Sequence, residues 1–198
     1  MRAQAERPER DSGWKTATTI TALSAGGVAL LMPRVFYSDP GVTVGWKARY
    51  HVSVLAPVMT ITALSLANEV FFQDWIEGNR PDCNDDTLGD PRCASYGMMS
   101  THSFFAFSAF GEGTGVFLAD TFKWSDGRFN GGAFVGHVGV PLVLSVITAV
   151  GRTAGNWETG GQVWGSAGIG LATGIGTGLL YALMQRPECG YTGKLICW

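Results

Sequence analysis

Five stretches of this chain are nearly free of charged side chains, and they limit what it can fold into. No Asp, Glu, Lys or Arg occurs in residues 16–33, 50–68, 129–151 or 159–185, and residues 103–119 contain only Glu112. Each stretch approaches the roughly 20 residues that a helix needs to cross a bilayer core. The pattern predicts an all-α fold, a polytopic membrane helix bundle of about five transmembrane helices. A soluble helical protein with a very apolar core is the alternative, which so many long uncharged stretches disfavour.

The same stretches predict how the chain is organised. We expect a solvated N-terminal tail (1–15), one transmembrane bundle (16–185) and a C-terminal tail (186–198). The expected helices are 16 to Pro33, Tyr50 to about Phe72, 102–120, 131–151 and 162–185. Residues 1–31 could also be a signal peptide, but no small-x-small cleavage site follows, which favours a retained segment. The net charge of −2 and the absence of a Lys/Arg-rich run indicate no nucleic-acid partner.

Loop charges predict the orientation of this bundle. Counting crossings places the 73–101 and 151–161 loops on one side, and the 34–49 loop with the 121–130 turn on the other. Because Lys and Arg prefer the cytoplasmic side, the basic 34–49 loop is expected inside. We therefore expect an integral membrane protein of the bacterial inner membrane, with the 73–101 and 151–161 loops extracytoplasmic. The N-terminus would be outside and the C-terminus inside, although four basic residues in the N-terminal tail point the other way.

The four cysteines form two candidate disulfide pairs. Cys83 and Cys93 close a short acidic loop on the expected outer face, where a disulfide would persist. Cys189 and Cys197 have similar spacing, but this topology places them in the cytoplasm, where a bridge would be unusual. Two bridges would therefore argue against the helix count. Neither pair has the CxxC spacing of a zinc site, and we expect no metal or cofactor.

Three polar clusters fall on the same expected face. They are Arg80-Pro81 after the second helix, Ser100 with His102 before the third, and Arg152 after the fourth. Two guanidiniums, a hydroxyl and an imidazole suit an anionic, oxygen-rich group such as phosphate. Each also has a simpler interpretation: Arg80 balances acids of its own loop, Arg152 lies at headgroup level, and Ser100 with His102 caps a helix.

The order Arg-Pro, then Ser-x-His opening a helix, then Arg before a Gly-rich helix resembles the type 2 phosphatidic acid phosphatase (lipid phosphate phosphatase) superfamily. The resemblance covers about residues 52–185. It implies that Arg80, Ser100 and Arg152 bind phosphate and that His102 protonates the leaving oxygen. In that family a third-motif histidine attacks phosphorus, and an Asp orients it.

The match to the family motifs is incomplete. Gln73 stands at the position of the first-motif Lys, and Met99, Thr101 and Gly151 replace further motif residues. The nucleophile position is occupied by Glu158 and the orienting position by Gln162. A carboxylate is a poor substitute for an attacking imidazole, and it would neutralise Arg152 and repel phosphate. The resemblance therefore predicts a degenerate member without the family's phosphatase turnover.

Glu112 and His137 form a second, deeper candidate site. Counted from the inner helix ends, both lie roughly 9–12 Å deep, so they could meet. An ionisable residue in a membrane span suggests proton or ion handling. A buried polar pair that only fixes helix register is the structural alternative, and no contact is the third.

Residues 162–185 carry Gly170, Gly174 and Gly178 four apart, and a further set of glycines. Such a stripe lets another helix approach closely, either inside the bundle or in a homo-oligomer. Three functions remain open. The favoured one is a degenerate fold that binds an anionic lipid headgroup or serves as a subunit of a membrane complex. The others are an active phosphatase on lipid or isoprenoid phosphates, and proton or ion handling.

Overall fold

The structure, a computed structural model, describes residues 10–37, 59–76, 78–81, 83, 93, 99–124 and 127–184. All regular elements in these ranges are helical, as the sequence predicts. The chain forms α1 (Ser12–Tyr37), a helix over 59–76 that ends in η1 (Asn68–Phe72) and α3 (Gln73–Ile76), α4 (Thr101–Ala119) with η4 (Asp120–Trp124), then α5 (Gly131–Phe134), η5 (Val135–Gly139), α6 (Val140–Ala154) and α7 (Gly160–Met184).

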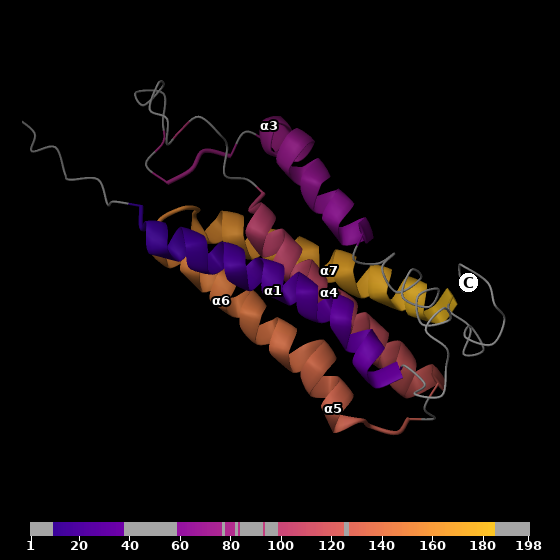
Figure 1. Cartoon of the computed structure of the whole chain (residues 1–198). Helices are drawn as coiled ribbons and strands as arrows, with labels where there is room; N and C mark the ends of the chain where they lie inside the picture. Colours follow the sequence, from indigo (N-terminus) through magenta and orange to yellow (C-terminus); the bar gives the residue numbers. More distant parts are fainter. Residues whose placement is uncertain are drawn as a thin grey trace, which may run out of the picture.

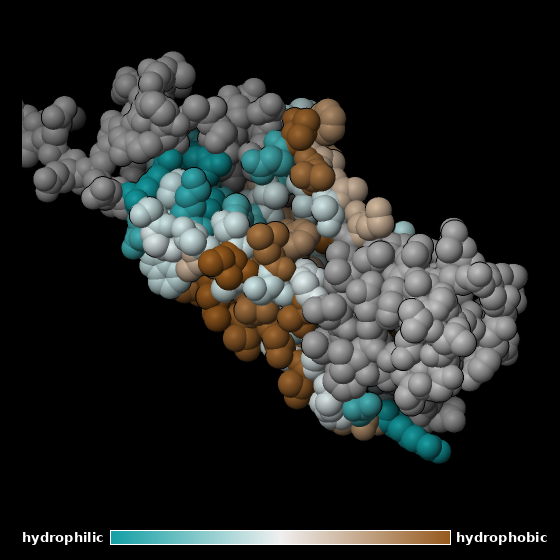
Figure 2. All heavy atoms as spheres, in the orientation of Figure 1, coloured by the Kyte–Doolittle hydropathy of each residue, from teal (hydrophilic) through white to brown (hydrophobic). Residues whose placement is uncertain are grey.

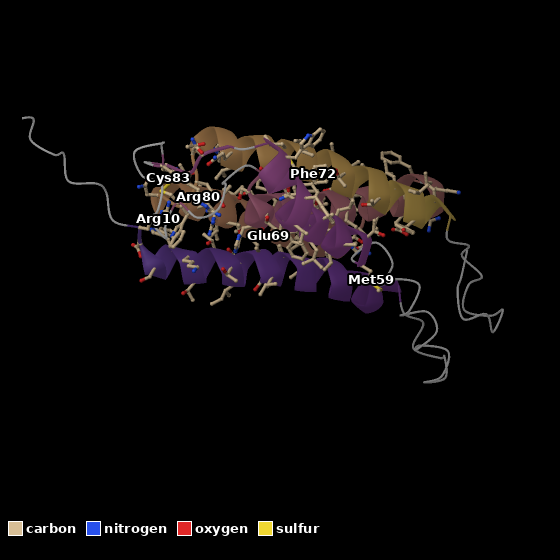
Figure 3. All side chains as sticks on the ribbon, turned by 90° about the horizontal axis from the view of Figure 1, so that it is seen from above. Arg10, Met59, Glu69, Phe72, Arg80 and Cys83 are labelled. Atoms are coloured by element: carbon tan, nitrogen blue, oxygen red, sulfur yellow. A yellow bond between two sulfur atoms is a disulfide. The ribbon has the colours of Figure 1, made fainter. Side chains whose placement is uncertain are left out.

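Helix α4 lies at the centre of the bundle. It packs against α7, α1 and α6, and the 59–76 helix lies across it between α1 and α7 (Figures 1 and 3). Twelve of its nineteen residues are buried. On one side the alanines Ala106 and Ala109 meet an alanine row of α1. Small side chains therefore allow three helices to surround α4 closely.

The tightest packing joins α4 to α7, and it depends on glycine. A Cβ atom at Gly170, Gly174 or Gly178 would overlap the backbone of Phe104, Ser108 or Glu112. In return, a Cβ at Gly111 or Gly115 would overlap the backbone of α7. The glycine stripe predicted from the sequence therefore packs inside the bundle. The sequence had left this arrangement and a homo-oligomer contact open. Five other α7 glycines meet open space instead: Gly160, Gly161, Gly165, Gly168 and Gly176.

The distribution of side chains is the reverse of that in a water-soluble bundle. The buried residues are mainly Ala, Gly, Ser and Thr, with a few charged groups. Large apolar side chains face outward instead, including Val143, Val146, Ile147 and Val150 of α6. Figure 2 shows hydrophobic residues along the side of the bundle and hydrophilic ones toward its ends. An exposed apolar surface of this extent indicates contact with lipid or another protein.

By length and composition, two described helices could cross a membrane: Gly131–Ala154 and Gly160–Leu183. Helix length and composition therefore do not establish the five membrane spans that the sequence led us to expect. Helices α1 and α4 are long enough but rich in Ser, Thr and Gly, and the apolar helix Met59–Phe72 is short.

Several expected boundaries are wrong by a few residues. Helix α1 begins at Ser12, inside the predicted tail, because the Asp11 carboxylate accepts hydrogen bonds from the backbone of Gly13 and Trp14. It also continues beyond Pro33 to Tyr37. The second helix runs past Phe72 to Ile76. The predicted C-terminal tail, 186–198, lies outside the described residues.

The starts of α1, α4 and α7 and the end of α6 lie together at one end of the bundle. We call this the polar end. Backbone Asp11 donates to the Gly155 carbonyl, and backbone Ser100 donates to the hydroxyl of Ser166. The Arg80 guanidinium reaches the carbonyl of Trp157. The described parts of the 73–101 and 151–161 loops therefore share one end, as the crossing count requires.

The glycine packing gives a direct stability prediction. Gly174→Ala should lower the free energy of unfolding by about 1–3 kcal/mol, because the new methyl group forces α7 away from the Ser108 carbonyl. Gly176→Ala is the matched control: it meets open space and should leave stability unchanged or raise it by up to about 1 kcal/mol. Thermal unfolding in detergent measures both. Equal effects would contradict the packing described here.

Candidate functional site

A buried ion pair organises the polar end. Arg152, in the last turn of α6, donates two hydrogen bonds to Glu158: Nε to Oε2 at 3.1 Å and Nη2 to Oε1 at 2.6 Å. Each residue is 4% exposed. The turn between them brings Glu158 back over the helix end, with Asn156 at a positive φ of 57° and the Trp157 amide bonded to the Arg152 carbonyl. Such a two-bonded pair is the strongest form of guanidinium–carboxylate contact.

Arg80 approaches the same carboxylate from another part of the chain. Its Nη1 lies 3.9 Å from Glu158 Oε1 and donates to the Trp157 carbonyl at 3.4 Å. Burial lowers the pKa of Arg80 from its ordinary value, while the charge of Glu158 acts in the opposite direction. Glu158 therefore lies between two guanidiniums, in the position that the resemblance gives to a nucleophilic histidine.

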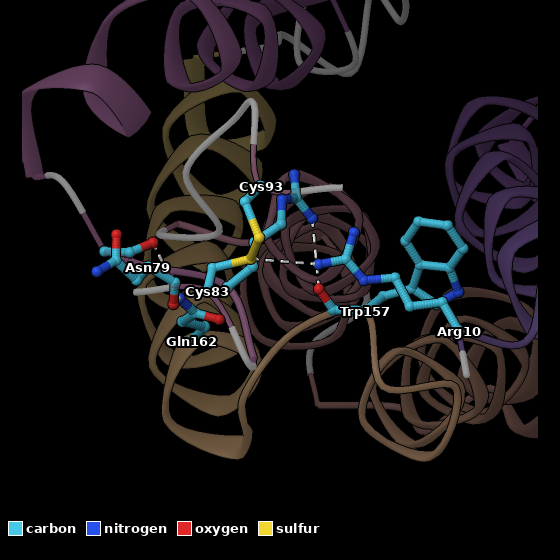
Figure 4. The surroundings of a disulfide bond; sticks show 8 residues. Arg10, Asn79, Cys83, Cys93, Trp157 and Gln162 are labelled. Carbon is cyan, nitrogen blue, oxygen red and sulfur yellow. Dashed lines mark hydrogen bonds between the residues drawn. A yellow bond between two sulfur atoms is a disulfide. The ribbon is translucent and has the colours of Figure 1, made fainter. Parts of the chain in front are cut away.

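A disulfide fixes the segment that carries Arg80. Cys83 and Cys93 are joined, as the sequence led us to expect, and the Cys83 amide donates to the Arg80 carbonyl. Figure 4 shows this bond beside Arg10, whose guanidinium donates to Cys83 Sγ at 3.7 Å. The other candidates, Cys189 and Cys197, lie outside the described residues.

His102 lies near this cluster but points to α1. Its Nε2 is 3.1 Å from the Thr19 hydroxyl. The charges of Arg152, Glu158, Glu69 and Arg80 also act on the imidazole. One of its two ring nitrogens is thus engaged with α1.

Ser100 caps α4. Its side chain accepts a hydrogen bond from the Ser103 amide at 3.3 Å and donates to the Ser103 hydroxyl at 3.1 Å. It is fully buried. These contacts are those of a helix cap, the simpler of the two interpretations that the sequence allowed for Ser100. Its hydroxyl bonds at the start of the helix.

Gln162 also has a structural role. Thr159 and Gln162 form a reciprocal cap at the start of α7, in which each side chain accepts from the other's backbone. The Gln162 amide then donates to the carbonyls of Gly78 and Asn79, at 3.2 and 2.7 Å (Figure 4). Gln162 therefore attaches the Arg80 segment to α7 and does not orient Glu158.

Sequence reasoning missed several residues of the polar end. The Trp157 ring has cations over it from Lys15 at 5.1 Å, Arg10 at 5.4 Å and Arg152 at 5.6 Å, distances typical of cation–π contacts. Trp157 Nε1 donates to the Asp11 carbonyl at 2.9 Å. The sequence signal that could have revealed these contacts is Asp11. It is a helix-capping residue type inside the predicted N-terminal tail.

A second missed contact attaches the 59–76 helix to α4. The Thr101 hydroxyl donates to the Glu69 carboxylate, and the Asn68 amide donates to Thr101 Oγ1 and to the Met99 carbonyl, both at 3.1 Å. At the other end of this helix, the Thr60 hydroxyl bonds to that of Tyr181 at 3.0 Å. Polar bonds thus hold both ends of the helix on the bundle.

Glu112 and His137 are both buried at 1% exposure. Gly113 packs on the backbone of His137, whereas the backbone of Glu112 packs on Gly178. Within the described chain no hydrogen bond joins the two side chains, so a hydrogen-bonded pair is not found, and the proton or ion role stays a prediction.

Comparison of this chain with protein-family models, curated proteins and solved structures finds no match. The function must therefore be argued from the site itself. In the described ranges no group of three or more His, Cys, Asp or Glu side chains could hold a metal ion. The polar end therefore offers two guanidiniums beside one internal carboxylate, which accepts two hydrogen bonds from Arg152 and lies 3.9 Å from Arg80.

The buried pair gives the second prediction. Arg152→Ala should destabilise the protein by about 3–5 kcal/mol, because it leaves the Glu158 charge buried without its partner. The double variant Arg152→Met, Glu158→Leu should recover most of that loss, since it removes both charges. Arg128→Ala, at an exposed site, is the control and should change little. Chemical unfolding in detergent would measure all three, and a double variant no better than Arg152→Ala would contradict the pairing.

Proposed function

We propose that this chain is an integral membrane protein with about five transmembrane helices and a lipid-phosphatase-like arrangement. The outward-facing apolar side chains and the small, polar interior support it, because helices in lipid pack through small residues. Helix α4 needs little hydropathy of its own because its neighbours shield it from lipid.

The proposed orientation places the polar end outside the cytoplasm. The Cys83–Cys93 disulfide supports this, since disulfides persist in oxidising compartments such as the bacterial periplasm. The described parts of the 73–101 and 151–161 loops, which the charge pattern assigns to that face, meet at this end. An inner-membrane location in a bacterium is part of the same proposal.

We further propose that the site is catalytically degenerate and binds an anionic lipid headgroup without hydrolysing it. One observation carries this: the Glu158 carboxylate is held by Arg152 and lies beside Arg80. A carboxylate bound by two hydrogen bonds cannot readily attack phosphorus, and its charge repels an incoming phosphate. Turnover through the family's mechanism is therefore not expected.

Cations around the pair support headgroup binding. The half-buried Arg10 and the exposed Lys15 lie over Trp157, and the half-buried Arg80 and the buried Arg152 lie beside Glu158. An anionic headgroup at the polar end would meet Arg10 and Lys15 first and would compete with Glu158 for the two inner arginines. We expect weak binding, limited by that competition.

A role as a subunit of a membrane complex or homo-oligomer is the second candidate. The specific observation in its favour is that α7 presents Gly165, Gly168 and Gly176 outward with open space beside them. Small residues of this kind permit close helix contact in lipid.

The third prediction concerns turnover. Purified protein offered short-chain phosphatidate or an isoprenyl diphosphate should release no phosphate above background, because Glu158 occupies the nucleophile position. The double variant Glu158→His, Gln162→Asp tests whether the rest of the site remains competent. Phosphate release by the natural chain that His102→Ala abolishes would establish an active phosphatase instead.

The fourth prediction concerns binding. Glu158→Gln keeps the shape of the side chain but removes the competing charge, so its affinity for short-chain phosphatidate should rise roughly tenfold, about 1.4 kcal/mol. Inorganic phosphate and phosphatidylcholine distinguish a free anion and a neutral lipid surface from the headgroup. Arg128→Ala, on an exposed connection, should leave binding unchanged. Equal binding of phosphatidate by the natural chain and Glu158→Gln would contradict the competition.

A further inference from the structure

Glu112 is a buried carboxyl that the polar end does not use. It lies in α4, ten residues beyond His102 and so about 15 Å further along the helix axis. It is 1% exposed, and its Oε2 has no hydrogen-bond partner among the residues that the structure describes. The Ser108 hydroxyl, one turn earlier on the same side of α4, is also fully buried and without a partner.

The neighbouring backbone cannot supply these partners. Gly174 of α7 packs on the Ser108 carbonyl and the Glu112 amide, and Gly178 packs on Glu112 itself. These are helical residues, whose backbone groups already bond within their own helices.

Among the described side chains, no charge acts on this carboxyl. Five described titratable groups on the elements around α4 have contacts elsewhere. They are Tyr181 of α7, bonded to Thr60; His137 of η5, beside Gly113; Arg152 of α6, bonded to Glu158; Lys15 of α1, over Trp157; and Glu69 of the 59–76 helix, bonded to Thr101.

An ionised carboxylate in this position would be costly, because neither a cation nor a donor offsets its desolvation. A metal ion does not solve the problem, since Glu112 and Ser108 offer only two side-chain groups, whereas hard cations take six or more oxygen ligands. A single bound proton removes the charge and with it this cost. We propose that Glu112 is an interior proton-binding site, occupied in the resting protein and separate from the anion site at the polar end.

Glu158 provides an internal comparison. It is buried to a similar degree, 4% against 1%, but it accepts two hydrogen bonds from Arg152. The two acids are therefore alike in exposure and differ in whether a cation holds the carboxyl group. A reagent that needs both an apolar environment and a protonated carboxyl will distinguish them.

Hydrophobic carbodiimides are such reagents. The proton of the acid passes to one carbodiimide nitrogen, and the carboxyl oxygen adds to the central carbon to give an O-acylisourea. Transfer of the acyl group from oxygen to nitrogen then leaves a stable N-acylurea on the side chain. All atoms of both reactants remain in the product, so mass spectrometry of peptides locates the adduct.

The experiment treats the full chain in detergent at neutral pH with dicyclohexylcarbodiimide, and a parallel sample with a water-soluble carbodiimide. We expect the hydrophobic reagent to modify Glu112 at least tenfold more than Glu158, and the water-soluble reagent to leave Glu112 unmodified. The comparison is made within the natural protein, so it does not depend on a variant that folds.

Glu112→Gln adds a second measurement. Infrared spectra of the natural chain and this variant should differ by one protonated carboxyl band at neutral pH. An unmodified Glu112, modification of Glu158 to the same extent, or a carboxylate band in the infrared difference would each overturn the proposal. None of these outcomes affects headgroup binding, which is tested at Glu158.

Discussion

The close approach of α4 and α7 is the constraint on which the rest of the structure depends. Because Gly170, Gly174 and Gly178 lack side chains, the two backbones meet, and α4 becomes the axis around which α1 and α6 pack. This packing fixes the start of both helices at one level, so that the cap of α4 at Ser100 bonds to Ser166 near the start of α7. The polar end is assembled as a consequence: α6 ends beside these starts, and its turn returns Glu158 to Arg152.

The polar end and the interior use acids in opposite ways. Glu158 is held by Arg152 with Arg80 nearby, so its charge is balanced, and we propose that it competes with anions for the guanidiniums. Glu112 has no such partner among the described residues, which favours its neutral form. Both acids are buried, and their different partners lead us to propose different roles for them.

Charge-free stretches predicted the described helices well, because long segments without charged side chains can be enclosed along their whole length. They failed at helix ends, where a local cap such as Asp11 decides the start. The residues of the site were also foreseeable in part: motif order pointed to Arg80, Arg152 and Glu158. The pairing of Arg152 with Glu158 could not be foreseen, because it depends on the turn through Asn156 and Trp157, which only the structure shows. Equal depth suggested that Glu112 and His137 could meet, but depth carries no information on which side of α4 a residue faces, and no hydrogen bond joins them in the described chain.

The central claim is that Glu158 occupies the arginines that would otherwise hold phosphate. It can be tested most directly by NMR in one detergent sample containing short-chain phosphatidate, recording the arginine Nε–H signals and phosphorus together. The account predicts a hydrogen-bonded Arg152 Nε–H signal in the natural chain that phosphatidate barely shifts, a clear shift of that signal by phosphatidate in Glu158→Gln, and no inorganic phosphate in either sample. Growth of an inorganic phosphate signal with the natural chain, or an Arg152 signal indifferent to Glu158→Gln, would contradict it.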